Sequence, residues 1–187
     1  MRLSLDHMNV WLTADHHIGH ANILRYCNRP FKDVHEMRES ILNNFNSIVE
    51  PDDIVFYLGD IGMNEQVTDE VLGRMNGKIH FILGNHDKSC MQAIKKHSET
   101  VSDLIDAEID GQPITMCHYA MRVWHKSHFD APQIYAHSHG RLPPVGKQWD
   151  VGVDNNDFKP LSYNDLKHIM ESRPHNDNYI PEDKRNR

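Results

Sequence analysis

Short apolar runs recur along the chain and are rich in β-branched and aromatic residues, which is typical of buried strands. They occupy residues 9–14, 53–59, 78–84, 113–118, 133–138 and 149–154. Runs of this length are too short for an ordinary helix and long enough for a strand. We therefore predict a strand in each run.

Apolar residues at helical spacing separate the early runs. Residues 33–50 show this spacing, and Asp33 with Glu36 three residues later resembles a capping box. Further helices are predicted over residues 65–76, 89–98 and 162–172, the last one capped by Ser162. The first half thus alternates strand and helix, which favours right-handed βαβ units and a parallel sheet. The second half is strand-rich with Pro and Gly turns, which suggests antiparallel or mixed pairing.

Length and composition indicate one globular unit. The chain has 187 residues, of which 39% are hydrophobic and 25% charged, ordinary values for a folded protein. We expect a single domain over residues 1–172. Residues 173–187 have little apolar content, and we expect a loosely ordered polar tail there.

Charge and cysteine usage restrict the partners. With 20 Lys and Arg against 27 Asp and Glu, the formal net charge is -7, so no global positive field would hold long nucleic acid. Three cysteines without a C-x-x-C pair favour reduced thiols in a cytoplasmic protein. No apolar run is long enough to span a membrane, so we expect no membrane-spanning helix. We make no prediction of the oligomeric state.

Polar side chains of the kinds that bind metal ions follow five of the predicted strands. They are Asp15, His17, Asp60, Asn85, His118, His137 and His139. In α/β sheets, ligand sites form where loops converge at the carboxyl ends of strands. Two i, i+2 pairs occur in this set, and extended backbone would point both members of a pair to one side. A glycine directly precedes Asp60 and another precedes Asn85, which lets the backbone bring both side chains close to an ion.

Seven ligands are too many for one tetrahedral site, but they suit two metal ions about 3.5–4 Å apart that share a carboxylate. Two divalent cations exceed the charge of two aspartates, which favours a bridging hydroxide and an anionic substrate such as a phosphate ester. Imidazole, carboxylate and amide ligands without thiolate suit Mn²⁺ first, with Fe, Ni or Zn as alternatives.

Each motif also has a plainer explanation. In a chain with 15 histidines, a lone D-x-H or H-x-H pair is usually a coincidence, and the G-N-H-D at residues 84–87 suits a tight turn. All of them standing in register with strand ends is much harder to obtain by chance. We therefore favour a shared metal site.

Five motifs in this order match a known family. They are Asp15-x-His17, Gly59-Asp60, Gly84-Asn85-His86-Asp87, His118 and His137-x-His139. Over roughly residues 9–154 the chain resembles the calcineurin-like metallophosphoesterases, and residues 17–31 and 150–166 are similar to small single-domain members from bacteria and phages. The resemblance implies an α/β (α+β) fold, a four-layer αββα sandwich of two mixed sheets flanked by helices, with the dimetal site at the strand ends.

The resemblance also implies a role for each motif residue. One ion would be held by Asp15, His17, Asp60 and His139, and the other by Asp60, Asn85, His118 and His137. His86 would act as the acid close to the leaving group, and Asp87 would either orient His86 or serve the turn. The arginine and second aspartate that follow the bridging aspartate in the protein serine/threonine phosphatases are missing here, which argues against a protein-phosphatase role.

The function expected from these residues is hydrolysis of phosphate esters by in-line attack of a metal-bridging hydroxide. A small or nucleotide-like phosphorylated substrate is expected, with phosphodiesters favoured over monoesters. The alternatives are a nuclease on DNA or RNA ends and, less favoured, a catalytically silent binding scaffold. In the first loop we expect His20 and Arg29 to contact substrate, and we expect His16, which extended backbone would point the other way, to be structural.

Overall fold

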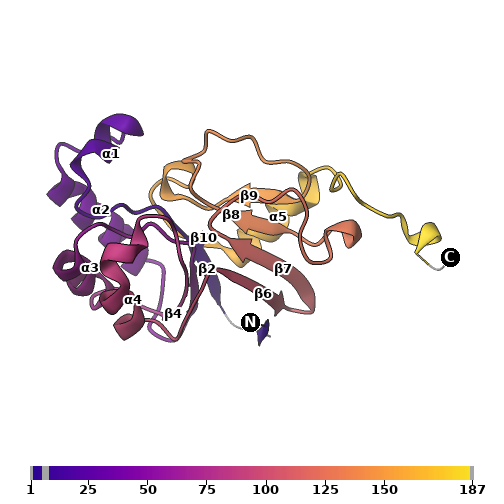
Figure 1. Cartoon of the computed structure of the whole chain (residues 1–187), viewed down its shortest axis with the longest axis horizontal. Coiled ribbons are helices and arrows are strands. Elements are labelled where there is room, and N and C mark those ends of the chain that lie inside the picture. Colours follow the sequence, from indigo (N-terminus) through magenta and orange to yellow (C-terminus); the bar gives the residue numbers. More distant parts are fainter. Residues whose placement is uncertain (1, 6–8, 186–187) are drawn as a thin grey trace.

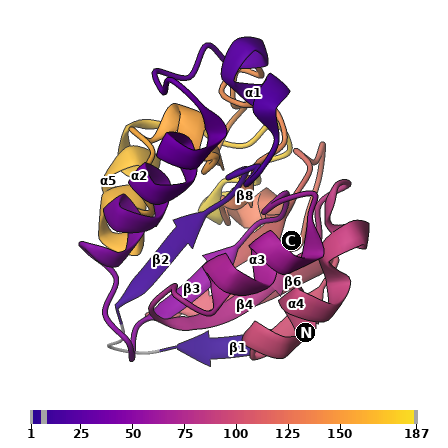
Figure 2. The ribbon, with the colours of Figure 1, turned by 90° about the vertical axis from the view of Figure 1, so that its left-hand side faces the viewer.

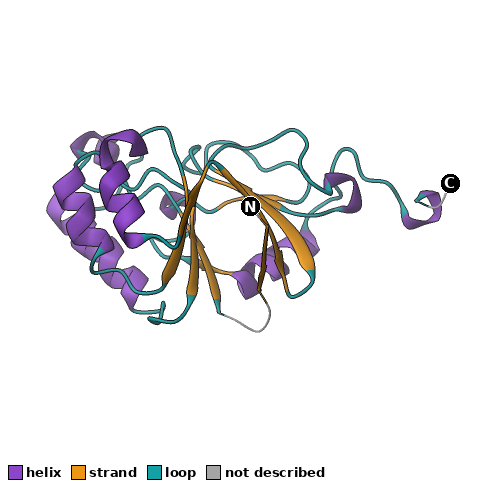
Figure 3. Ribbon diagram, turned by 60° about the horizontal axis from the view of Figure 1, so that its bottom comes forward, coloured by secondary structure: helices purple, strands orange, loops and turns teal. Residues whose placement is uncertain are grey.

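The computed structural model describes residues 2–5 and 9–185. Two five-stranded sheets lie face to face, and Figure 3 shows them meeting at one end and opening toward the other. An isolated parallel bridge between Ala14 and Gly152 joins the two sheets, one residue past β2 on one side and two residues past β9 on the other. The loops that follow these strands are thereby brought together.

The first sheet is parallel except for one short edge strand. Its order is β10 (Leu161–Ser162), β2 (Val10–Thr13), β3 (Ile54–Tyr57), β4 (Lys78–Ile82) and β5 (Thr100–Ser102). Only β10 runs antiparallel to its neighbour β2. The predicted parallel sheet in the first half of the chain is confirmed.

The second sheet is mixed, as predicted. Its order is β1 (Arg2–Leu5), β6 (Leu104–Ile109), β7 (Gln112–Cys117), β8 (Gln133–Tyr135) and β9 (Gln148–Asp150). The antiparallel pair β6 and β7 is a hairpin whose turn is Asp110-Gly111, and both turn residues have positive φ. An Asp-Gly pair of this kind forms a two-residue turn whose twist matches that of the strands.

Three of the five α-helices in the described residues begin after a side chain that accepts one or more of their first N–H groups. The five are α1 (Ala21–Tyr26), α2 (Val34–Asn46), α3 (Glu65–Leu72), α4 (Met91–His97) and α5 (Tyr163–Ser172). The Asp33 carboxylate accepts the N–H groups of His35 and Glu36, while Glu36 reaches back to the N–H of Lys32, one residue earlier than in a standard capping box. Ser162 caps α5 as predicted.

Apolar side chains form a core between the two sheets and a second core between the first sheet and the helices on its outer face. Figures 1 and 2 show α2, α3 and α4 on that outer face. Tyr163 and Leu166 of α5 enter the core between the sheets. A third, smaller cluster of Ile23, Met37, Ile41 and Val153 fixes the first loop against α2 and the turn after β9.

Several elements were not predicted, namely α1, β1, β5, β6 and β10. In β6, buried and half-buried residues alternate strictly, so one face carries carboxylates and no continuous apolar run exists. The predicted helices over 33–50 and 65–76 end earlier, at Asn46 and Leu72.

The beginning of the predicted tail is docked. The Asn176 side chain is buried and donates to the carbonyls of Ser127 and Ala131. Beyond it, the chain extends away from the body of the molecule (Figure 1), and residues 186–187 lie outside the described residues. Within the described ranges, no helix is long and apolar enough to cross a membrane.

Candidate metal centre

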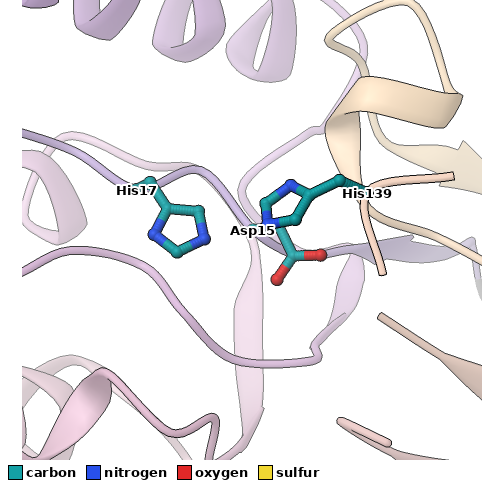
Figure 4. A group of neighbouring side chains, drawn as sticks. All are labelled: Asp15, His17 and His139. Carbon is teal, nitrogen blue, oxygen red and sulfur yellow. The ribbon is translucent and has the colours of Figure 1, made fainter. Parts of the chain in front are cut away.

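The structure brings predicted ligands from both sheets to the end where the sheets meet. Asp15 and His17 follow β2, and Asp60 follows β3, whereas His118 follows β7 and His139 lies beyond β8. Asp15, His17 and His139 place one potential ligand atom each within 4.8 Å of one another. Figure 4 shows Asp15 and His17 extending from one segment of chain, with His139 reaching Asp15 from another.

Asp60 lies between this cluster and a second one. Its Oδ2 atom is 3.6 Å from Nε2 of His17 and 3.5 Å from Nε2 of His118. Asp60, His118 and His137 form another group whose ligand atoms lie within 4.8 Å of one another. One carboxylate is therefore shared by two neighbouring groups of candidate ligands, the arrangement expected for a pair of metal ions.

The donor atoms of these groups fit a cation. Oδ1 of Asp15, both ring nitrogens of His17 and Nε2 of His118 are buried, and none has a hydrogen-bond partner among the described residues. Buried polar atoms are nearly always paired in folded proteins, so a cluster of unpaired polar atoms calls for a ligand. Imidazole nitrogen with carboxylate oxygen is a donor set that suits a first-row divalent metal.

In two histidines of the site, a hydrogen bond at Nδ1 fixes the orientation of the ring. Nδ1 of His118 lies 2.6 Å from the carbonyl oxygen of Leu58, which can only accept, so Nδ1 carries the proton. Nδ1 of His139 lies 2.7 Å from Oδ2 of Asp154. In both residues Nε2 is left as the atom that faces the site, the usual arrangement for a metal-binding histidine.

The backbone at the ligands is strained. Asp15, His17, Asp60, His137 and His139 all have φ between 50° and 68°, a left-handed region that costs a non-glycine residue about 1–2 kcal/mol. The side chains of the two i, i+2 pairs therefore converge through left-handed backbone, and the prediction of extended backbone at these pairs is wrong. Such strain concentrates at functional sites and persists because surrounding contacts impose it.

Two glycines allow the loops after β3 and β4 to touch. A Cβ atom on Gly59 would lie 2.4 Å from the Gly84 nitrogen, and one on Gly84 would lie 2.3 Å from Oδ1 of Asp60. A side chain at position 59 would displace Gly84 or His118, and one at position 84 would displace Asp60. The two glycines bring the loops that carry Asp60 and Asn85 together, and the approach of these side chains to an ion stays a prediction.

Burial shifts the pKa values of two candidate ligands in opposite directions. Burial raises the pKa of Asp15 to about 7, despite the opposing attraction of His139. Burial also lowers the pKa of His17 to about 3, against the attraction of Asp60. A divalent cation favours both the ionised carboxylate and the neutral imidazole, so it would offset both costs of burial.

His86 lies beside His17 and Asp60. Its ring centroid is 5.3 Å from that of His17, and it groups with His17 and Asp60 within 4.8 Å. Its backbone N–H donates to Oδ1 of Asp60. Asn85, the residue before it, is exposed and lines a cavity of about 270 Å³ together with Tyr119.

Asp87 holds the loops together and does not serve as the orienting partner of His86. Its fully buried carboxylate accepts the backbone N–H groups of Asp60, Ile61 and Gly84. The prediction of a catalytic Asp87 is thus corrected to the alternative, a residue that fixes the turn.

Arg29 does not face a substrate, which corrects a second prediction. Its guanidinium is fully buried and pairs with Asp154. Asp154 was not predicted as a site residue, because it lies in the turn after β9 and no ligand-type spacing marks it there. His20 remains a candidate, since its ring is 6.3 Å from that of His86 and its Nδ1 is buried without a partner among the described residues. His16 bonds Thr13 Oγ1 and packs on Tyr57, which confirms a structural role.

The chain is similar to several known proteins. The chain is 31% identical over 172 residues to an uncharacterised protein of Methanocaldococcus jannaschii, covering 87% of this chain and 91% of that one. It is 36% identical over 83 residues to the gene 66 protein of Mycobacterium phage L5, covering 42% and 40%. A solved structure of a protein of unknown function from Aquifex aeolicus shares the fold, with a TM-score of 0.68 and 21% identity over 87% of this chain and 99% of that one.

A family model carries the assignment further. The model described as the calcineurin-like phosphoesterase superfamily domain matches residues 8–142, a range that holds all seven predicted metal ligands and His86. The chain therefore belongs to the calcineurin-like phosphoesterase superfamily.

Proposed function

We propose that this protein is a phosphoesterase that depends on two divalent metal ions and acts on small or nucleotide-like phosphodiesters in preference to monoesters. The observation that carries the proposal is the place of Asp60, whose Oδ2 lies 3.6 Å and 3.5 Å from the Nε2 atoms of His17 and His118. A carboxylate shared between two ligand groups is the hallmark of sites that pair two ions on one phosphate.

The residues that would hold the two ions divide around Asp60. One set is Asp15, His17, Asp60 and His139, and the other is Asp60, Asn85, His118 and His137. Bound divalent cations would supply a water of lowered pKa and neutralise charge on the phosphate oxygens. Mn²⁺ is the first choice for this donor set, with Fe, Ni or Zn as alternatives.

His86 would hold the proton that the leaving group needs. Its ring borders His17, and its backbone is anchored to Asp60, so its position is tied to that of the shared carboxylate. Proton donation matters most for alkoxide leaving groups, which are strongly basic, and least for acidic phenols.

The cavity beside Asn85 supports a diester. It measures about 270 Å³, and its walls include Lys88, Met91 and Tyr119. Tyr119 is 46% exposed, and its ring packs edge-on against His118 and His137. A diester carries a second substituent, for which this cavity, lined by apolar side chains together with Lys88 and Asp103, offers room beside Asn85.

A substrate panel on Mn²⁺-loaded protein tests the proposal. Nitrophenyl diesters, nitrophenyl monoesters, cyclic dinucleotides and labelled oligonucleotides would be compared, with the metal-free protein and Asp60→Asn as controls. We expect turnover of diesters above that of monoesters, abolished in both controls. Preferred cleavage of oligonucleotide ends would instead identify a nuclease, against which the net charge of -7 argues. No turnover of any substrate would leave a binding scaffold.

A further inference from the structure

A buried ion pair lies directly behind one half of the metal centre. Arg29 and Asp154 are separated by 125 residues, yet two hydrogen bonds of 2.8 Å and 2.7 Å join the guanidinium to the carboxylate. The side chain of Arg29 is 0% exposed and that of Asp154 is 7% exposed. The first loop and the turn after β9 therefore meet at this pair.

The guanidinium has no donor left for a substrate. Two of its five N–H groups point at Asp154, and the others point at the carbonyl oxygens of Asp15 and His16 and at the Met37 sulfur. The bonds to the two carbonyls are 2.7 Å and 2.8 Å long. Arg29 thus fixes the segment that carries the candidate ligands Asp15 and His17.

Asp154 connects Arg29 to the loop that carries His139. Its Oδ2 atom accepts from Nη2 of Arg29 and also lies 2.7 Å from Nδ1 of His139. The carboxylate therefore lies between the guanidinium of Arg29 and the ring of His139, and it forms an ion pair with the guanidinium. A charged acceptor behind a histidine fixes its ring and makes its other nitrogen a better donor to a metal.

We propose that Arg29 and Asp154 are positioning residues that hold His139 and the Asp15–His17 segment in the geometry of the first ion, and so set the affinity of that ion. The proposal rests on the proposed metal site, but it does not depend on the substrate. A buried ion pair contributes little to stability compared with well-packed apolar residues. Stability alone therefore does not account for Arg29 and Asp154.

The second ion serves as an internal reference. Its ligand His118 is anchored separately, by the carbonyl oxygen of Leu58. Its other predicted ligands, Asn85 and His137, form no hydrogen bond with Arg29 or Asp154 in the described part of the chain. A change at Asp154 should therefore weaken one ion selectively, whereas general loosening of the fold would weaken both.

The test is titration calorimetry of the metal-free protein with Mn²⁺. The variants are Asp154→Ala, which removes the acceptor of His139, and Arg29→Lys, which keeps the charge but loses the two-pronged bond. The matched control is Arg74→Lys, which alters a half-exposed pair with Glu39 whose closest N–O distance is also 2.7 Å. Circular dichroism with EDTA would establish that each variant is folded.

We expect Asp154→Ala to weaken one of two Mn²⁺ sites by about 10- to 100-fold while the other changes by less than about threefold. Arg29→Lys should weaken the same site to a smaller extent, and Arg74→Lys should match the wild type. Should Asp154→Ala fail to fold, the double variant Arg29→Met/Asp154→Asn removes both charges together and keeps an amide oxygen for His139. It should fold and retain a weakened first site.

Folded variants of Arg29 and Asp154 that bind both ions as tightly as the wild type would overturn the proposal. Equal weakening of both sites, or the same effect in Arg74→Lys, would also overturn it. If the wild type binds two ions and hydrolyses no ester, the proposed function fails while the selective loss at Asp154→Ala still stands. The two claims therefore fail separately.

Discussion

Asp60 and His118 follow strands of different sheets, yet Oδ2 of Asp60 lies 3.5 Å from Nε2 of His118. The candidate metal centre is therefore complete only when the two sheets are packed together. Any ion that binds there binds the folded chain and not the unfolded one, so metal binding and folding are linked.

Metal removal should therefore lower the melting temperature. Each ion present at about 100 times its dissociation constant adds about 2.7 kcal/mol to the free energy of unfolding. We expect the melting temperature, followed by circular dichroism, to fall on addition of EDTA and to recover with excess Mn²⁺. An unchanged melting temperature would show that the unpaired atoms of Asp15 and His17 do not hold a cation.

Replacing His86 should separate acid catalysis from metal binding. We expect His86→Ala to reduce kcat for a diester with an alkoxide leaving group by about 10²- to 10⁴-fold, because the leaving oxygen loses its proton donor. The loss should be much smaller with a nitrophenolate leaving group. Mn²⁺ stoichiometry, measured by atomic absorption, is the control and should stay at the wild-type value. Equal losses with both leaving groups would exclude His86 as the acid.

A methyl group at position 84 should disrupt the centre through contact alone. In Gly84→Ala, the new Cβ would lie 2.3 Å from Oδ1 and 2.7 Å from the nitrogen of Asp60. We expect a free energy of unfolding about 1–3 kcal/mol lower, the usual cost of overpacking, and weaker Mn²⁺ binding. Gly111→Ala is the matched control, because a Cβ there meets nothing within 4 Å and only its φ of 75° opposes it. Unchanged Mn²⁺ affinity in Gly84→Ala would show that Asp60 can move without harm.

His80 gives a pH dependence that is separate from the metal centre. It is 8% exposed on β4 and bonds Thr100 Oγ1, and burial lowers its pKa below the usual 6.5. The unfolded chain then takes up a proton first as pH falls, so this contribution to stability is full above about pH 6.5 and is lost below it, by at most about 1.4 kcal/mol per pH unit.

The measurement compares wild type and His80→Gln by urea unfolding with EDTA at pH 7.5, 6.5 and 5.5. We expect the stability difference between the two proteins to shift in favour of His80→Gln as pH falls. A difference that stays constant across this range would show that burial does not hold His80 neutral.

The strand ends and their ligands could be predicted because the pattern is local. An apolar run followed by Asp60, or by Asn85 and His86, is visible in a few residues, and topology then brings the carboxyl ends together. The left-handed backbone at Asp15 and His139 could not be predicted, because contacts between loops impose it. Hydrogen bonds between residues far apart in the sequence could not be predicted either.

Arg29 illustrates the second limit. In the sequence it is a cation in a polar loop beside the motif, and phosphate recognition was the natural prediction. Only the fold shows that its guanidinium is hydrogen-bonded to Asp154, 125 residues away. The strictly alternating β6 was missed for a related reason, since its apolar face becomes apparent only against β7 and the facing sheet.

The central claim is that two metal ions share Asp60, and electron paramagnetic resonance of Mn²⁺-reconstituted protein tests it most directly. We predict that two ions bind per chain and give the spectrum of a spin-coupled pair, and that Asp60→Asn loses this coupling. A spectrum of isolated Mn²⁺ ions at saturation, or an unchanged coupled spectrum in Asp60→Asn, would contradict the account.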